Sequence, residues 1–114
     1  MAFKLALSPK FWADVKVELA PEDGKKPIVA EIEVQYLRMT VTEAQAFMEK
    51  VKEEKLSDVQ CARLVMCDWR KVVDDDDQPT EFNDHNRDQL LDAGFASAIM
   101  QAFFRSQPKA KEKN

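Results

Sequence analysis

The strongest constraint on the fold is a pair of stretches, residues 11–19 and 28–37, in which apolar and polar residues alternate. A period of two is typical of a β-strand with one buried and one exposed face. The PEDGKKP segment between them carries a glycine and two prolines, which is the composition of a connecting loop. The apolar members of the pattern are Phe11, Ala13, Val15, Val17, Leu19, Ile28, Ala30, Ile32, Val34 and Tyr36. The alternation predicts an antiparallel β-hairpin over about residues 11–37.

A two-stranded ribbon alone is marginal in water, so its apolar face must be covered. We interpret the hairpin as completing a core on the helices that the rest of the chain predicts. The other interpretation is that the hairpin gains a strand from elsewhere, by β-augmentation from a partner. The predicted fold class is α+β, with an N-terminal antiparallel β-hairpin packed on a small bundle of three to four α-helices.

Apolar residues at helical spacing predict helices at about residues 42–55, 57–73, 83–93 and 95–106. Thr42 with Gln45, and Ser57 with Gln60, have the form of capping boxes, whose side chains satisfy backbone N–H groups at a helix start. Asn83 can cap the third helix. The apolar face of the first helix is predicted to consist of Ala44, Phe47, Met48 and Val51.

The helix predicted over residues 57–73 lies at the centre of the chain. Its apolar face is broad, which suits a helix covered from more than one direction. Trp69 is expected in the core, with its indole N–H bonded to an acceptor at the helix end. Four consecutive aspartates and Pro79 then stop helical continuation.

Gly94 interrupts the C-terminal helical pattern and predicts a helix end or a bend. The KAKEKN end has no apolar residue larger than alanine, so residues 108–114 are predicted to be a disordered Lys-rich tail. The chain has 114 residues, and we expect a single α+β domain over residues 1–107.

Charge and hydropathy argue against two classes of partner. A net charge of −4 and a pI near 5.0 disfavour sequence-independent nucleic-acid binding, which needs clustered Lys and Arg. No apolar run approaches the roughly 20 residues that cross a membrane, and the N-terminal stretch has too little apolar length for a signal peptide. We therefore expect a cytoplasmic protein without nucleic-acid or membrane partners.

The residues most indicative of chemistry are Asp74, Asp75, Asp76 and Asp77, with His85 downstream. Hard cations take several oxygen ligands, and hydrolytic metal sites often include a histidine. Consecutive carboxylates on an irregular loop seldom aim at one point, and the spacing lacks the glycine and terminal glutamate of a calcium loop. We interpret the run as a solvated acidic turn without a metal, and keep metal-dependent hydrolysis as the alternative.

Other catalytic arrangements find less support. Cys61 and Cys67 fall on nearly opposite faces of one predicted helix, which predicts reduced, packed thiols rather than a disulfide or a nucleophile. Two glycines in the whole chain are too few for a phosphate-binding loop. We therefore expect a non-enzymatic protein with no catalytic residue and no cofactor.

The last helix offers candidates for partner binding. Phe103 and Phe104 are adjacent, about 100° apart around a helix, so one of them can project from the core. Met100 flanks them, and adaptable Met and Phe surfaces suit nonpolar segments of other proteins. Core packing is the other interpretation for each of the three. The predicted partner-binding set is Met100, Phe103, Phe104, Asp74, Asp75, Asp76 and Asp77.

In the order of its parts, the chain resembles the tail assembly chaperones of long-tailed bacteriophages and prophages. The matching features are the strand pair, the acidic break after a Trp, a helix start, an aromatic helix and a Lys-rich end: FWADVKVEL with IVAEIEVQYL, MCDWRKVVDDDD, PTEFNDHNRDQLLD, FASAIMQAFF and KN. The chain departs from the commoner form where DDDD replaces an Asp-Gly type of turn and DAGFA replaces a break that contains proline.

The resemblance implies a non-enzymatic protein of the bacterial host cytoplasm. Such a protein coats the tape measure protein, recruits tail tube subunits and leaves before the virion is finished. The residues alone also allow a small acidic adaptor or inhibitor that mimics nucleic acid through Asp74–Asp77 and binds a basic protein. The sequence leaves the oligomeric state open, including a homo-oligomer.

Overall fold

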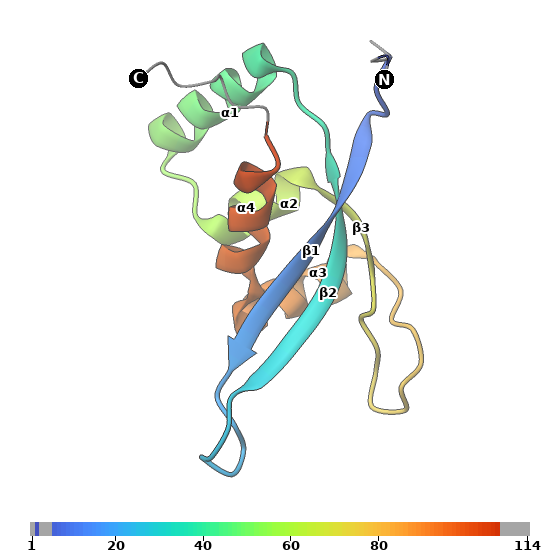
Figure 1. The fold of residues 1–114 in the computed structure, drawn as a ribbon. Coiled ribbons are helices and arrows are strands. Elements are labelled where there is room, and N and C mark those ends of the chain that lie inside the picture. Colours follow the sequence, from blue (N-terminus) through green and yellow to red (C-terminus); the bar gives the residue numbers. More distant parts are fainter. Residues whose placement is uncertain (1, 3–5, 108–114) are drawn as a thin grey trace.

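The two alternating stretches form the predicted hairpin, with β1 at Lys10–Leu19 and β2 at Ile28–Leu37 (Figure 1). The computed structural model describes residue 2 and residues 6–107, so the tail predicted at 108–114 lies outside the described residues. The strands pair antiparallel, with Val15 opposite Ile32, and both of these side chains are buried. The alternation in the sequence is therefore that of a sheet with one covered face.

A third strand, β3 at Met66–Arg70, pairs antiparallel with β2 and gives the sheet the order β1-β2-β3. The helix predicted over residues 57–73 is wrong in its second half, because α2 covers only Asp58–Val65. The hairpin thus gains an additional strand from its own chain. The coarse prediction of an α+β fold is confirmed.

A bulge in β3 explains why this strand has a helical pattern in the sequence. Tyr36 of β2 lies opposite Met66, and the shift in register leaves Cys67 with no residue opposite it. The extra residue puts Met66 and Trp69, three positions apart, on the same buried face. A spacing of three is also typical of a helix, so the bulged strand continues the apolar period of α2.

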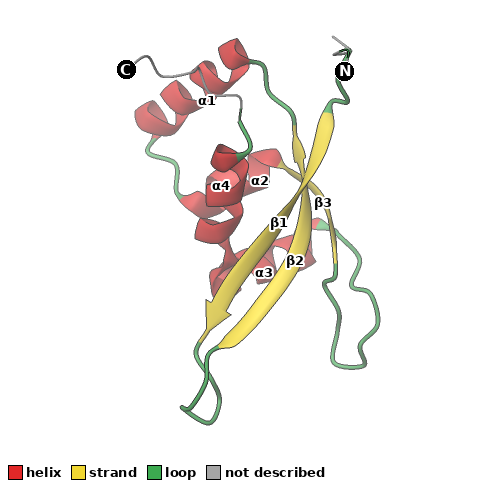
Figure 2. Ribbon diagram, in the orientation of Figure 1, coloured by secondary structure: helices red, strands yellow, loops and turns green. Residues whose placement is uncertain are grey.

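Helices cover one face of the sheet (Figure 2). α1 spans Val41–Glu54. α3 (Asp84–Leu90), the π-helical turn η1 (Leu91–Phe95) and α4 (Ala96–Arg105) follow one another, with a bend at Gly94, whose φ is 109°. α4 packs against both β1 and α2. Within the described part of the chain, no helix combines the length and apolar character needed to cross a membrane.

Two of the predicted helix starts are confirmed. At α2, Ser57 Oγ accepts from the backbone N–H of Gln60 at 3.2 Å, and Gln60 Oε1 accepts from the backbone N–H of Ser57 at 2.8 Å. Asn83 caps α3 through its side-chain oxygen. These bonds satisfy N–H groups that the helix leaves unpaired at its first turn.

The prediction for the start of α1 is wrong by two residues. Thr40 and Glu43 form the capping box, with bonds of 3.1 and 2.9 Å, where the sequence pattern also offered Thr42 and Gln45. Both pairs have the required spacing. The earlier pair caps the helix because Thr40 has extended backbone angles, whereas Thr42 lies inside α1.

Aromatic rings from the sheet and the helices meet in the core. Tyr36 stacks on Phe11 with 5.3 Å between ring centroids, and Phe103 lies 5.5 Å from Tyr36. The Tyr36 hydroxyl donates to the backbone carbonyl of Ile99 in α4 at 2.7 Å. Burial raises the pKa of Tyr36, so this donor keeps its proton at neutral pH. The hydrogen bond joins the central strand to α4.

Trp69 is buried, as predicted, and it holds the loop that follows β3. Its indole N–H donates to the backbone carbonyl of Thr80 at 2.8 Å, and its ring lies edge-on to Phe82 with 5.1 Å between centroids. The acceptor belongs to the returning arm of the loop and not to a helix end, because no helix ends there. The tryptophan therefore closes the segment that carries the aspartates.

Candidate functional site

An open, chiefly apolar groove lies between α1 and the C-terminal end of α4 and has a volume of about 640 Å³. We name it the α1–α4 groove. Both walls are mainly helical, so side chains define most of the surface. The lining residues are Val41, Ala44, Gln45, Phe47, Met48, Glu49, Phe103, Phe104 and Gln107.

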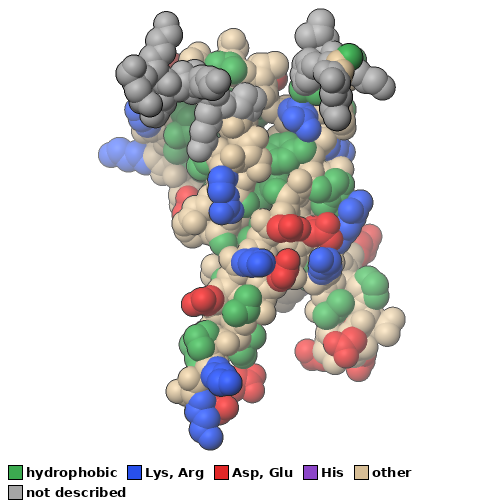
Figure 3. Space-filling view, viewed as in Figure 1, with side chains coloured by type: hydrophobic (Ala, Val, Ile, Leu, Met, Phe, Trp, Pro, Cys, Tyr) green, Lys and Arg blue, Asp and Glu red, His purple; other side chains and the backbone are tan. Residues whose placement is uncertain are grey.

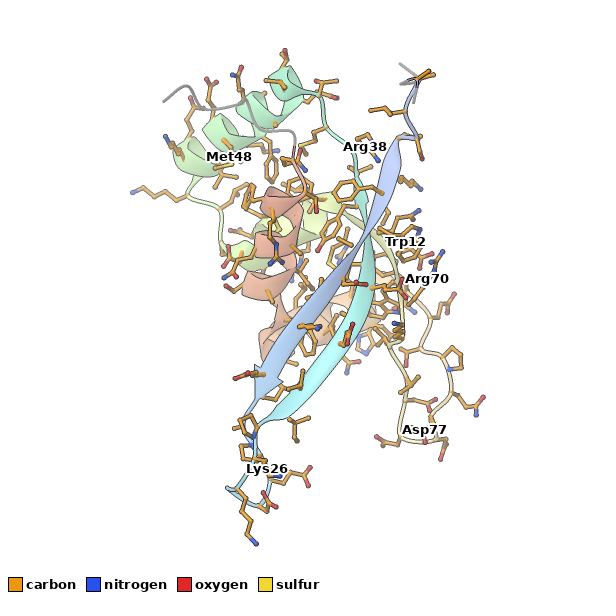
Figure 4. The ribbon with its side chains drawn as sticks, viewed as in Figure 1. Trp12, Lys26, Arg38, Met48, Arg70 and Asp77 are labelled. Carbon is orange, nitrogen blue, oxygen red and sulfur yellow. The ribbon has the colours of Figure 1, made fainter. Side chains whose placement is uncertain are left out.

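α1 forms one wall of the groove because its apolar stripe is wider than the part it buries. Phe47 is the buried residue of α1, and its ring lies edge-on to Phe103 with 6.1 Å between centroids. Val41 and Met48 are seven positions apart and so share a side of the helix, yet they are 58% and 40% exposed. Phe47 and the partly buried Val51 pack α1 against the core. Two large apolar side chains of α1 stay exposed, and one of them is Met48 (Figure 4).

Phe104 forms part of the opposite wall and is 37% exposed. Its ring packs edge-on against the buried Phe103, with 5.5 Å between centroids. The structure thus separates the adjacent pair as the 100° step around a helix allows, with one ring in the core and one at the surface. Met100 is buried in the core and lies outside the groove lining, so it presents no surface to a partner.

The polar atoms of the groove lie among apolar neighbours. Glu49 is the charged residue of the lining, and Gln45 lies one turn before it on α1. At the end of α4, Gln107 Nε2 donates to the backbone carbonyl of Phe103 at 3.2 Å. A mainly apolar lining with one carboxylate suits an apolar segment that carries a basic side chain at its margin.

The four aspartates form an exposed turn at the opposite end of the molecule from α1 (Figure 1). Asp74 Oδ1 accepts from the backbone N–H groups of Asp76 at 2.9 Å and Gln78 at 3.0 Å. Asp77 lies at the tip with a φ of 60°, a left-handed conformation that Asp tolerates. The structure has the solvated acidic turn that the sequence predicts, and Asp74 stabilises that turn through backbone contacts.

The structure does not unite His85 with the aspartates in one site. His85 is exposed in the first turn of α3. Among residue 2 and residues 6–107, no three His, Cys, Asp or Glu side chains are grouped so that they could hold a metal ion. Hydrolytic metal chemistry thus has no geometric support in this part of the chain.

The two cysteines lie on different elements, which corrects the prediction that one helix carries both. Cys61 is buried in α2, and Cys67 is half-buried on β3; both are free thiols. Burial raises the pKa of each thiol above its ordinary value. Both groups are therefore protonated near neutral pH, and a protonated thiol is a weak nucleophile.

Sequence reasoning found part of the groove. Met48 belongs to the predicted apolar face of the first helix, and Phe104 to the predicted partner-binding set, whereas Val41 precedes the predicted helix start. The sequence signal for an open groove was the apolar stripe on α1. This stripe contains more apolar residues than Phe47, the residue of α1 that is buried. The pairing of α1 with the end of α4 depends on tertiary placement and has no local signal.

The fold and the groove define a small α+β protein with a surface suited to an apolar segment of another molecule. Comparisons of the chain with protein-family models, with curated proteins and with solved structures find no match.

Proposed function

We propose that the protein is a non-enzymatic assembly chaperone that holds an apolar helical segment of a client protein in the α1–α4 groove. The observation that carries the proposal is the exposure of Val41, Met48 and Phe104 around one open groove. Scattered apolar side chains on a surface need no explanation, but a contiguous set around a concavity marks an interaction site.

A helix suits this groove better than an extended segment. An extended peptide gains affinity by pairing with an open sheet edge, and neither wall of the groove offers one. Two helices with a groove between them accept a third helix, whose apolar residues at i, i+3, i+4 and i+7 pack between the rows of side chains on the walls. The carboxylate of Glu49 favours a client helix with a basic residue at the edge of its apolar stripe.

The groove predicts weak binding by each copy. Completing the burial of Val41, Met48 and Phe104 would contribute about 1 kcal/mol for each side chain, before the cost of ordering the complex. Such contacts hold a client firmly only when many are made along its length. Weak individual contacts also allow release when a permanent partner competes for the same segment.

The resemblance to phage tail assembly chaperones supports a specific client. In this proposal the client is the tape measure protein, a long and aggregation-prone chain, and the complex recruits tail tube subunits in the host cytoplasm. The β1–β2 hairpin then lies on a small bundle of helices, and the α1–α4 end of that bundle faces the client. The net charge of −4 helps to keep the complex dispersed.

Co-expression with the tape measure protein of the same phage or prophage tests the proposal. The wild-type chain should raise the soluble fraction of the tape measure protein and co-purify with it, whereas Met48→Glu combined with Phe104→Glu should abolish both effects. Leu64→Glu is the matched control, because Leu64 is 44% exposed on α2 and does not line the groove. An insoluble client with no co-purification by the wild type would count against the proposal.

A second candidate function is an acidic adaptor or inhibitor that binds a basic protein through the turn at Asp74–Asp77. The observation that favours it is that the turn is exposed and projects away from the sheet and helices (Figure 1). Its binding should weaken with added salt and be lost when Asp75, Asp76 and Asp77 become Asn. Asp74 is left in place because it caps the turn. Binding that is indifferent to this change would remove the candidate.

A further inference from the structure

The outer edge of β1 is open along the described chain. β1 pairs with β2 on one side only, and no other described strand pairs with it. It runs for ten residues without a proline or a bulge, and Pro9 and Pro21 lie outside it. Soluble proteins usually protect a long edge strand, because its unpaired N–H and C=O groups are a template for another strand.

A hollow of about 490 Å³ lies along this edge between β1 and α4. Its wall on β1 is formed by Ala13, Asp14 and Lys16, and its wall on α4 includes Gln101 and Arg105. The space beside the strand is therefore unfilled by the described residues. α4 also contacts β1, so a strand placed in this hollow would lie beside Gln101 and Arg105.

The outer face of β1 carries two opposite charges that have no ion pair within the described chain. Asp14 lies across from Glu33, a like charge that Lys71 and Arg70 contact at 3.6 and 4.0 Å. Lys16, two residues along β1, forms no ion pair within that same part of the chain. Figure 3 shows acidic and basic side chains together over this region of the hairpin. Asp14 and Lys16 are thus available to charges on an adjacent strand.

We propose that the occupant of this edge is β1 of a second copy of the chain, paired antiparallel around a two-fold axis at Val15. In this register Asp14 of each copy lies opposite Lys16 of the other, so the dimer gains two cross-strand pairs of opposite charge. On the covered face, Val15 meets its equivalent and Ala13 meets Val17. The two sheets join into one of six strands, three from each copy.

Charge selects this register over its neighbours. A shift by one residue would place the apolar face of one strand beside the polar face of the other, so only shifts that keep the faces matched need comparison. Moving the axis to Asp14 would set Asp14 against itself. Moving it to Lys16 would set Lys16 against itself and Asp14 against Glu18. Like charges directly opposite each other destabilise a strand pair.

The other sheet edge is a weaker template for a second copy. β3 pairs with β2 only over Glu33–Tyr36, contains a bulge and is five residues long. Short length and bulges are the devices that blunt an edge strand. The remainder of β2, from Ile28, pairs with no described strand on that side. The long and regular β1 is therefore the edge that we assign to the dimer.

Size-exclusion chromatography with light scattering on the full chain tests the dimer. The measured mass of the wild type should rise with protein concentration from 13.1 kDa to twice that value. Asp14→Lys sets a second lysine opposite Lys16 of the other copy, and Lys16→Asp sets two aspartates opposite each other. Either change should raise the dissociation constant of the dimer about tenfold or more. An equimolar mixture of the two variants should dimerise again, because every cross-strand pair is then of opposite charge.

The controls separate a local charge pair from net charge and from misfolding. Asp75→Lys and Lys26→Asp make the same two changes of charge on exposed loops and should leave the dimer unchanged. Lys16→Asp also puts an aspartate across from Glu31 of its own chain, so its unfolding midpoint is measured beside that of the wild type. Recovery in the mixture shows that both variants are folded.

Hydrogen exchange locates the interface. Amides of β1 should gain protection as the wild-type protein is concentrated, and those of α1 should not. A wild type that stays monomeric at every concentration overturns the inference, and so does a dimer that both single variants form as readily as the wild type. The dimer does not depend on the client. Absence of a dimer would therefore not contradict client binding in the α1–α4 groove, and absence of client binding would not contradict the dimer.

Discussion

Replacing Tyr36 by phenylalanine tests the hydrogen bond that joins the sheet to α4. The hydroxyl is buried and lies 2.7 Å from the carbonyl oxygen of Ile99. Tyr36→Phe keeps the ring and its stacking on Phe11 while it removes the donor. A net hydrogen bond between neutral groups contributes about 1 kcal/mol, so the free energy of unfolding in neutral solution should fall by about that amount. Urea denaturation of the two proteins measures the difference.

The same substitution should act in the opposite direction in alkaline solution. Burial raises the pKa of Tyr36 in the folded state, because the interior disfavours the phenolate. In the unfolded chain the phenol ionises at its ordinary pKa of about 10. A folded pKa above the unfolded pKa gives stability that is complete below about pH 10 and is lost as the pH rises above it. Relative to the variant, the wild type should lose about 1.4 kcal/mol for each pH unit in that window.

These opposing effects predict a crossing. The advantage of the wild type over Tyr36→Phe should vanish between about pH 10.5 and 11 and then reverse. Tyr36 is the single tyrosine of the chain, so tyrosinate absorbance follows its ionisation directly in the folded and unfolded protein. A stability difference that stays constant from neutral to alkaline pH would refute the reasoning, as would an ordinary pKa for this tyrosine in the folded protein.

Three other substitutions test how the helices are held. Phe47→Ala removes the contact of α1 with Phe103 and should lower the free energy of unfolding by about 3 kcal/mol in urea denaturation; a loss below about 1 kcal/mol would contradict this. Gly94→Ala should lower the free energy of unfolding by about 1 to 2 kcal/mol, because φ is 109° although no atom lies within 4 Å of the added Cβ; an unchanged denaturation midpoint would show that the bend relaxes. Ser57→Ala removes the capping oxygen of α2 and should cost about 1 kcal/mol. The thermal midpoint should then fall by roughly 4–8 °C, and a shift below that range would mean that water replaces the cap.

The elements that the sequence predicted well are those in which local and tertiary signals agree. The hairpin strands begin and end within one residue of their predicted bounds, because alternation, loop composition and burial all specify them. The last helix, predicted at 95–106, is α4 at Ala96–Arg105 for the same reason. The failure at β3 has a definite cause: a bulged strand and a helix both place apolar residues three apart, so Met66 and Trp69 fit either element. The segment forms a strand and not a helix because it pairs with the free edge of β2. The local sequence pattern contains no information about that pairing.

The candidate site was less predictable than the fold. The 100° step between Phe103 and Phe104 predicts that one ring leaves the core, and the structure identifies it as Phe104. The aspartates attracted attention by their composition, yet Asp74 bonds to its own turn. The groove depends on where α1 lies relative to α4, and the contact between Phe47 and Phe103 joins the two helices there. An apolar stripe in a sequence shows that a helix has a face to bury but not whether its own chain or another molecule buries it.

The two proposed surfaces are compatible in one assembly, because the α1–α4 groove and the hollow beside β1 share no lining residue. A dimer through β1 would therefore carry two open grooves related by the two-fold axis. Each groove alone binds weakly, because it covers only a small apolar area of the client. A client bound in one groove is present at a high effective concentration near the second groove. Dimerisation would thus strengthen binding to a long client with repeated apolar helices and change little for a short one. The charge variants of β1 test this expectation. They should weaken binding to the long client, whereas the affinity of each copy for a single client helix should stay unchanged.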